Sequence, residues 1–123
     1  KNKLFNFEDN IFKYFNDASL AITRAGATTL SELAYLQVPF IAIPYKFAAD
    51  NHQLENALKY EKNGCCWIIN ENEFNDTKLT TLLFKILNNK EDYLNKKKNL
   101  EKFFYQNNWN NINEKLINYL NEN

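Results

Sequence analysis

The sequence has no excess of charge of either sign. Its 15 lysines and arginines balance its 15 aspartates and glutamates, so the formal net charge at pH 7 is zero. A nucleic-acid-binding protein needs a basic face, and this balance argues against that class of partner. The three lysines at positions 96–98 are followed by Glu101, and we interpret them as the solvated face of a helix.

Cysteine and histidine are also scarce. The two cysteines, Cys65 and Cys66, are adjacent, and neighbouring cysteines are poorly placed to form an ordinary disulfide with each other. Together with the single histidine they do not make a zinc site, so we expect no metal and no cofactor. Because they lie in an apolar run, they are predicted to be buried thiols of a protein in a reducing, cytoplasmic setting.

Long hydrophobic runs, Gly/Ser-rich linkers and internal repeats are missing as well. The longest apolar stretch, residues 38–45, has the length of a strand and contains both prolines of the chain. No transmembrane helix is therefore predicted. The chain of 123 residues carries 10 Phe, 7 Tyr and 2 Trp. That is enough aromatic material for the core of about one domain.

Short apolar segments alternate with helical patterns along the chain, which is typical of a parallel sheet covered on both faces. The predicted fold class is therefore α/β, a Rossmann-like parallel sheet with flanking helices. Strands are predicted at residues 20–23, 40–43 and 65–69, with a further strand or connection at 4–7. Helices are predicted at residues 8–15, 29–36, 50–63, 79–87, 91–105 and 111–120.

Three residue types mark the ends of these elements. Pro39 and Pro44 flank the second strand, where a missing backbone N–H costs little. Gly64 stands at the C-cap position of the helix before the third strand. An asparagine-rich turn, residues 106–108, is predicted to separate the last two helices.

The segment "TRAGATTLSELA", residues 23–34, is the first candidate site. It follows a strand, and ligands of open parallel sheets bind at the carboxyl ends of strands. Gly26 permits a positive φ and a close approach of ligand to backbone. The free N–H groups of the next helix favour an anion such as a diphosphate. The alternative interpretation is local, because Thr29 and Glu32 have the spacing of a capping box.

The segment "ADNHQLENA", residues 49–57, is the second candidate. Asp50 and Gln53 have the spacing of another capping box, which would need no ligand. The functional interpretation places His52 and Gln53 on a first helical turn, facing the same crevice as Glu32. Side chains of these types offer the donors and acceptors that bind sugar hydroxyls.

Taken together, "RAGATTLSELAYLQVPFIAIPY", "ADNHQLENA" and "EKNGCCWII" resemble the carboxyl-terminal domain of the MurG family. That family comprises the GlcNAc transferases of bacterial peptidoglycan synthesis. The resemblance covers roughly residues 15–70 and continues more loosely to the C-terminus. It implies a glycosyltransferase-B fold, in which two Rossmann-like domains enclose a cleft and the carboxyl domain holds UDP-GlcNAc.

The resemblance also implies roles for individual residues. The turn Gly26–Thr29 would lie by the diphosphate, Glu32 would bind the ribose hydroxyls, and His52 and Gln53 would contact the GlcNAc or its phosphate. Arg24 would support the turn. The substrate-binding residues implied are Gly26, Ala27, Thr28, Thr29, Leu30, Ser31, Glu32, His52 and Gln53.

The activity implied is transfer of GlcNAc, with inversion, to the C4 hydroxyl of the MurNAc on lipid I, which gives lipid II. The enzyme would work as a peripheral protein at the cytoplasmic face of the membrane. Acceptor binding and the general base would belong to an amino-terminal domain, so no catalytic residue is assigned here.

Residues 1–123 are accordingly expected to be a fragment, part of the carboxyl-terminal domain, with C-terminal helices from about residue 91. The strand at residues 20–23 would then be an unpaired edge that favours aggregation of the isolated chain. Two alternatives remain open. One is the donor domain of another UDP-GlcNAc-using enzyme of the same fold, such as the eukaryotic dolichol-pathway enzyme, whose donor domain is a separate polypeptide. The other is a non-catalytic interaction module.

Overall fold

The computed structural model describes residues 20–45 and 52–122 of the chain. The strand predicted at residues 4–7, the helix predicted at 8–15 and the cap predicted at Asp50 lie outside these residues. The described elements are, in order, β1 (Ala21–Thr23), α2 (Ala27–Tyr35), β2 (Phe40–Ala42), α3 (His52–Lys62), β3 (Cys66–Ile68), the 3-10 helix η1 (Glu71–Glu73), α4 (Asp76–Leu87) and α5 (Lys90–Glu122).

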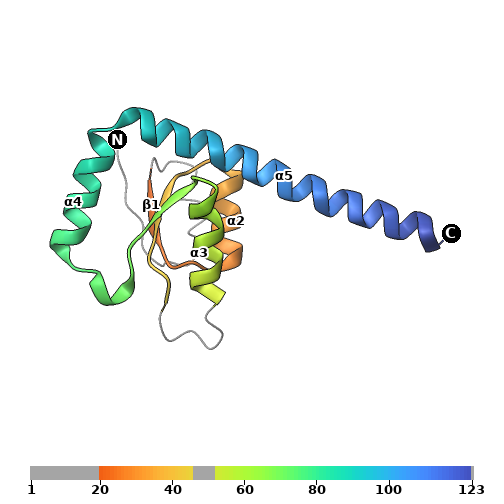
Figure 1. The fold of residues 1–123 in the computed structure, drawn as a ribbon, viewed down its shortest axis with the longest axis horizontal. Coiled ribbons are helices and arrows are strands. Elements are labelled where there is room, and N and C mark those ends of the chain that lie inside the picture. Colours follow the sequence, from red (N-terminus) through yellow and green to blue (C-terminus); the bar gives the residue numbers. More distant parts are fainter. Residues whose placement is uncertain (1–19, 46–51, 123) are drawn as a thin grey trace.

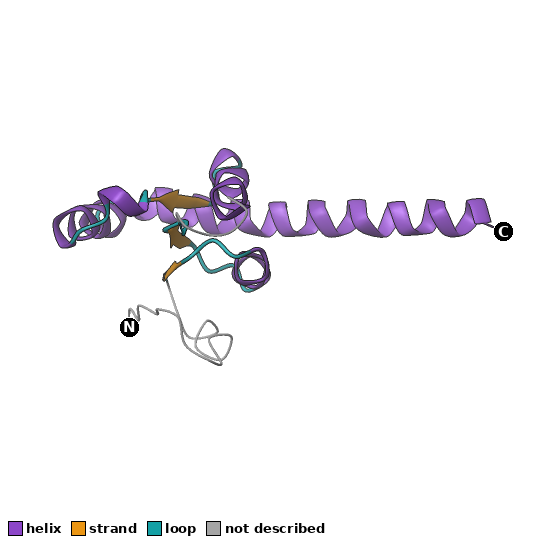
Figure 2. Cartoon of the chain, turned by 90° about the horizontal axis from the view of Figure 1, so that it is seen from below, coloured by secondary structure: helices purple, strands orange, loops and turns teal. Residues whose placement is uncertain are grey.

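The three strands form a parallel sheet in the order β1-β2-β3, as the fold-class prediction requires. Successive residues of a strand face opposite sides, so each strand contributes to two apolar clusters. Phe40 of β2 packs in the cluster formed with α2, α3 and α5, whereas its neighbour Ile41 packs in the cluster formed with α4. Figure 2 shows α2 and α3 on one side of the sheet and α4 on the other.

Within the described part of the chain, β1 lies at one edge of the sheet and pairs with β2 alone. Its side chains are nevertheless buried, with Ala21 fully enclosed and Ile22 nearly so. The position of the strand agrees with the predicted edge. That this edge makes the isolated chain aggregate stays a prediction.

The C-terminal region is a single helix of 33 residues, α5, and the prediction of two helices separated by residues 106–108 was wrong. The segment contains no glycine or proline, and an asparagine inside a helix costs less than about 0.7 kcal/mol relative to alanine. Asn108 also donates a side-chain hydrogen bond to the Phe104 carbonyl at 3.0 Å. The amino-terminal half of α5 packs on the domain, and the rest projects beyond it (Figure 1).

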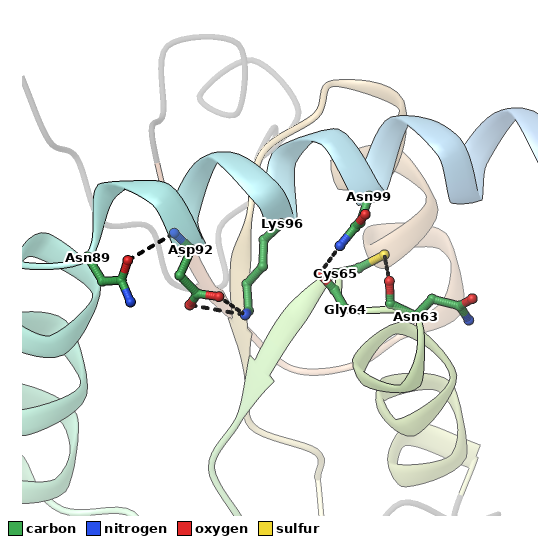
Figure 3. A network of polar contacts seen from close by, with 7 residues as sticks. All are labelled: Asn63, Gly64, Cys65, Asn89, Asp92, Lys96 and Asn99. Carbon is green, nitrogen blue, oxygen red and sulfur yellow. Dashed lines mark hydrogen bonds and ion pairs between the residues drawn. The ribbon is translucent and has the colours of Figure 1, made fainter.

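Figure 3 shows how the amino-terminal half of α5 is attached to the start of β3. Asn99 donates a hydrogen bond to the carbonyl of Gly64 at 3.1 Å. The ammonium of Lys96 lies 4.6 Å from the centre of the Trp67 ring and is paired with Asp92 at 3.1 Å. Gly64 has a φ of +72°, which confirms it as the glycine that ends α3.

Candidate functional site

The candidate residues belong to the beginnings of two helices at the carboxyl edge of the sheet, where α2 follows β1 and α3 follows β2 (Figure 1). A side chain of α3 joins the two helix beginnings. The Oε1 atom of Gln53 accepts hydrogen bonds from the backbone N–H groups of Ala25, at 3.3 Å, and Tyr45, at 2.7 Å. Gln53 therefore holds the residue before the α2 turn and the segment after β2 in one place.

Asn56 is a second member of this cluster that the sequence analysis did not identify. Its Nδ2 donates to the carbonyl of Ala25 at 3.1 Å. Ala25 thus has its N–H bound by Gln53 and its C=O bound by Asn56. The signal was present in the sequence, because residues three apart lie on the same face of a helix.

Helix α2 begins earlier than predicted, and the capping box of Thr29 and Glu32 is not formed. The N-cap is Gly26, whose carbonyl accepts the first helical hydrogen bond from Leu30 at 3.0 Å. Thr29 therefore lies inside the helix. The physical reason is tertiary: the bonds from α3 fix Ala25, so the chain turns into helix directly after it.

The backbone of Gly26 also differs from expectation. Its φ of −68° and ψ of 139° are extended values that any residue adopts, so no positive φ is used. A Cβ added to Gly26 would meet no atom of the described residues within 4 Å, and none of their side chains caps the helix. The N–H groups of residues 27–29 precede the first helical bond and have no acceptor within the helix. The positive end of the helix dipole lies at these N–H groups.

The other predicted residues differ widely in exposure. Leu30 is fully buried in the core, so only its backbone can face a ligand. Glu32 lies on the second turn of α2, half-buried, and no hydrogen bond or ion pair joins its carboxylate to another described residue.

His52 is 70% exposed and pairs with Glu55 of its own helix at 3.6 Å. Ala27, Thr28 and Ser31 are exposed and Thr29 is half-buried. The structure therefore connects Gln53 to the residue before the α2 turn through its bond to the Ala25 N–H.

Arg24 contacts residues that follow β2 and β3, and its expected role in supporting the turn stays a prediction. Its Nη1 lies 2.7 Å from Oε1 of Glu71 and 3.4 Å from the carbonyl oxygen of Ile43. Its guanidinium also lies over the ring of Tyr45, 5.2 Å from the ring centre. Glu71, from η1, was not identified from the sequence, because an acidic residue in a polar loop carries no local signal.

The two cysteines are buried free thiols, as predicted, at the beginning of β3 and so away from the carboxyl edge of the sheet. Burial raises the pKa of Cys65 to about 11 and raises that of Cys66 further. Both are therefore neutral at physiological pH. Among residues 20–45 and 52–122, no group of three or more His, Cys, Asp or Glu is arranged to hold a metal ion. In the same residues, no helix is long and apolar enough to cross a membrane.

Comparison with known proteins gives a family. Residues 1–111 match the model of the glycosyltransferase family 28 C-terminal domain. The chain is 49% identical over 121 residues to the UDP-N-acetylglucosamine–N-acetylmuramyl-(pentapeptide) pyrophosphoryl-undecaprenol N-acetylglucosamine transferase of Pelagibacter ubique, covering 98% of this chain and 34% of that protein. It is 42% identical to the enzyme of that name from Helicobacter pylori strain G27 over 96 residues, 78% of this chain and 27% of that protein.

A solved structure is similar as well. The crystal structure of Acinetobacter baumannii MurG superposes with a TM-score of 0.66 at 26% sequence identity. The superposition covers 81% of this chain and 28% of that one. The chain thus spans 34% and 27% of the length of these two curated relatives.

Proposed function

The chain belongs to the glycosyltransferase family 28 C-terminal domain family, and from that premise we propose that it forms the donor-binding part of a GlcNAc transferase. The donor is UDP-GlcNAc, and the acceptor is lipid I, undecaprenyl-diphosphate-MurNAc-pentapeptide. The product is lipid II. The names of the relatives support this reaction, since they describe transfer of N-acetylglucosamine to a pyrophosphoryl-undecaprenol acceptor.

One observation carries the proposal for this chain: no described side chain caps the beginning of α2, and the residue before it, Ala25, is hydrogen-bonded to Gln53 of α3. Unsatisfied N–H groups at a helix start are a ready site for a diphosphate. In the proposed reaction the diphosphate is the leaving group, on which negative charge builds as the glycosidic bond breaks. Donors already in place for that charge stabilise the transition state more than the ground state.

In this proposal, the other predicted residues bind the ribose and the sugar of the donor. The carboxylate of Glu32 accepts hydrogen bonds from the two vicinal ribose hydroxyls, which two carboxylate oxygens can do together. Gln53 uses its Oε1 on the backbone, so its Nε2 is the group that donates to the GlcNAc or its phosphate. His52 lies one residue earlier at the start of α3, exposed to a ligand.

The acceptor, the general base and the contact with the inner face of the membrane belong, in this proposal, to the part of the enzyme outside this chain. The role of residues 1–123 is to hold the anomeric carbon of GlcNAc toward the acceptor hydroxyl. Fixing two reactants in this way supplies a large part of the rate enhancement of many enzymes.

The experiment uses the full-length protein and the variant Glu32→Ala. Because Glu32 has no described partner, we expect stability to change by less than about 0.5 kcal/mol. Binding of UDP-GlcNAc and transfer of labelled GlcNAc to lipid I should both fall at least about tenfold, the equivalent of 1.4 kcal/mol. Glu101→Ala, an exposed carboxylate on α5, is the matched control. Unchanged binding and transfer in Glu32→Ala would contradict the proposal and favour a non-catalytic interaction module.

A further inference from the structure

Arg24 connects the ends of all three strands. It follows β1 directly, it donates to the carbonyl of Ile43 after β2, and it is ion-paired with Glu71 after β3. A guanidinium is suited to this because it presents several donors in one rigid plane and also stacks on an aromatic face. Here the aromatic face is that of Tyr45.

These contacts close into a ring with the Gln53 cluster. Arg24 lies against Tyr45, the N–H of Tyr45 binds Gln53, and Gln53 binds the N–H of Ala25, the residue next to Arg24. The position of the α2 turn relative to α3 is therefore set by a closed set of contacts. Glu71 is the group that ties this ring to the third strand.

The two ion pairs that involve η1 differ in distance and in exposure. The Arg24–Glu71 pair spans 2.7 Å, and its side chains are 33% and 25% exposed. The Lys78–Glu73 pair spans 3.5 Å, and its side chains are 55% and 54% exposed. Exposed pairs contribute little because water and salt screen them, whereas partial burial strengthens the attraction. Of these two acidic residues, only Glu71 is placed to hold the ring in position.

We infer that Glu71 is a positioning residue for the nucleotide-sugar donor, acting through Arg24. This inference rests on the proposed function. The carboxylate orients the guanidinium, the guanidinium orients the ends of β1 and β2, and these present the first turns of α2 and α3 to the diphosphate. Glu71 itself touches no substrate. Its loss loosens the donor site without removing any group that binds the donor.

The experiment compares Glu71→Gln with Glu73→Gln in the full-length protein. Both variants remove one negative charge from η1 and keep the size of the side chain. We expect Glu71→Gln to weaken UDP-GlcNAc binding, measured by titration calorimetry, about fivefold, which corresponds to about 1 kcal/mol. The KM for the donor should rise by a similar factor, while kcat stays within about twofold. Glu73→Gln should match the wild type in all three quantities.

A double variant tests whether Glu71 acts through Arg24. Arg24→Lys keeps the charge but loses the planar fork, and we expect it to weaken donor binding as well. If the two residues form one unit, Arg24→Lys combined with Glu71→Gln binds the donor no more weakly than the worse single variant. Multiplied losses in the double variant would overturn the inference.

Two further outcomes would also overturn it. One is donor binding by Glu71→Gln equal to that of the wild type. The other is a fall in the thermal unfolding midpoint of Glu71→Gln large enough to leave part of the protein unfolded under assay conditions, because Glu71 would then be merely structural. A wild-type protein that does not bind UDP-GlcNAc is a different result, which contradicts the proposed function and the inference together.

Discussion

The side-chain carbonyl of Gln53 accepts a hydrogen bond from the backbone N–H of Ala25, 28 positions earlier in the chain. This bond places the beginning of α3 against the residue before the α2 turn. Because the same oxygen binds the N–H of Tyr45, one amide group fixes the segments that follow two neighbouring strands. In the proposed enzyme, Gln53 is thus both a structural acceptor and, through Nε2, a donor to the substrate.

The two roles of Gln53 can be separated by substitution. Gln53→Ala removes the acceptor of two backbone N–H groups, one of them belonging to the buried Ala25, and we expect it to lower the free energy of unfolding by about 1–2 kcal/mol. Gln53→Glu keeps an acceptor oxygen and should be closer to the wild type in stability. It places a negative charge beside the proposed diphosphate, so it should bind UDP-GlcNAc at least about tenfold more weakly.

Urea unfolding midpoints and calorimetric titration with UDP-GlcNAc measure the two effects. Gln106→Ala, at an exposed glutamine of α5, serves as the control for loss of an amide side chain. Wild-type stability in Gln53→Ala would show that the two hydrogen bonds do not hold the turn. Wild-type donor affinity in Gln53→Glu would place the diphosphate elsewhere.

Gly26→Ala should leave the fold intact and impair the ligand site. The backbone of Gly26 is extended and a Cβ there meets no atom of residues 20–45 or 52–122 within 4 Å, so we expect a change in stability of less than about 0.5 kcal/mol. The added methyl group would stand in the open space where we propose that the diphosphate lies. Titration with UDP-GlcNAc should therefore show weaker binding by about tenfold or more. Undiminished affinity would argue that the ligand does not approach this backbone.

Gly64→Ala, at the other glycine, should lower the stability of the fold and leave the ligand site unchanged. Its φ of +72° is unfavourable for a residue with a Cβ, and an added Cβ would lie 2.7 Å from Nδ2 of Asn99. We expect a loss of about 1–3 kcal/mol in the free energy of unfolding, measured by urea denaturation. Donor affinity of the folded fraction should stay unchanged. A Gly64→Ala variant as stable as the wild type would contradict the packing of α5 on the start of β3.

Stability should fall at alkaline pH because of buried acids. Burial raises the pKa of the Cys65 thiol from 9.0 to about 11, and it raises the pKa of the Tyr60 hydroxyl from 10.0 to about 12. The unfolded chain therefore loses these protons first. Their contribution is fully present below pH 9 and is lost as the pH rises toward 12. We expect a decrease of about 1–2 kcal/mol in the free energy of unfolding between pH 8 and pH 11.

Urea midpoints measured across this pH range test the expectation. In Cys65→Ala, which removes one of the buried acids with a raised pKa, the midpoint should fall less steeply with pH, whatever its absolute value. A midpoint independent of pH up to 11 would mean that these groups titrate normally in the folded protein.

The parallel sheet could be predicted from the sequence because its strands are short, continuously apolar and bounded by Pro39, Pro44 and Gly64. The residue at which α2 begins could not be predicted. A capping box is a local pattern, and the hydrogen bonds from Gln53 and Asn56 to Ala25 come from a helix far along the chain. The end of α2 was predicted to within one residue, although Gln37, just after it, takes a positive φ of 57° that favours glycine or asparagine.

The prediction of two C-terminal helices was wrong for a different reason. Asparagine is common in turns, so residues 106–108 resembled a break, yet nothing in that segment prevents a helix from continuing. In the candidate site, the residue types near the two helix beginnings were predictable, because they follow neighbouring parallel strands. The ion pair of Arg24 with Glu71 was not, because it depends on how the η1 segment returns to the sheet.

The most direct test is a crystal structure of the full-length protein with UDP-GlcNAc bound. We expect the diphosphate to accept hydrogen bonds from the backbone N–H groups at the start of α2. We also expect the carboxylate of Glu32 to contact the ribose and Nε2 of Gln53 to contact the sugar or its phosphate. A donor molecule bound without any contact to the first turns of α2 and α3 would contradict the proposed function.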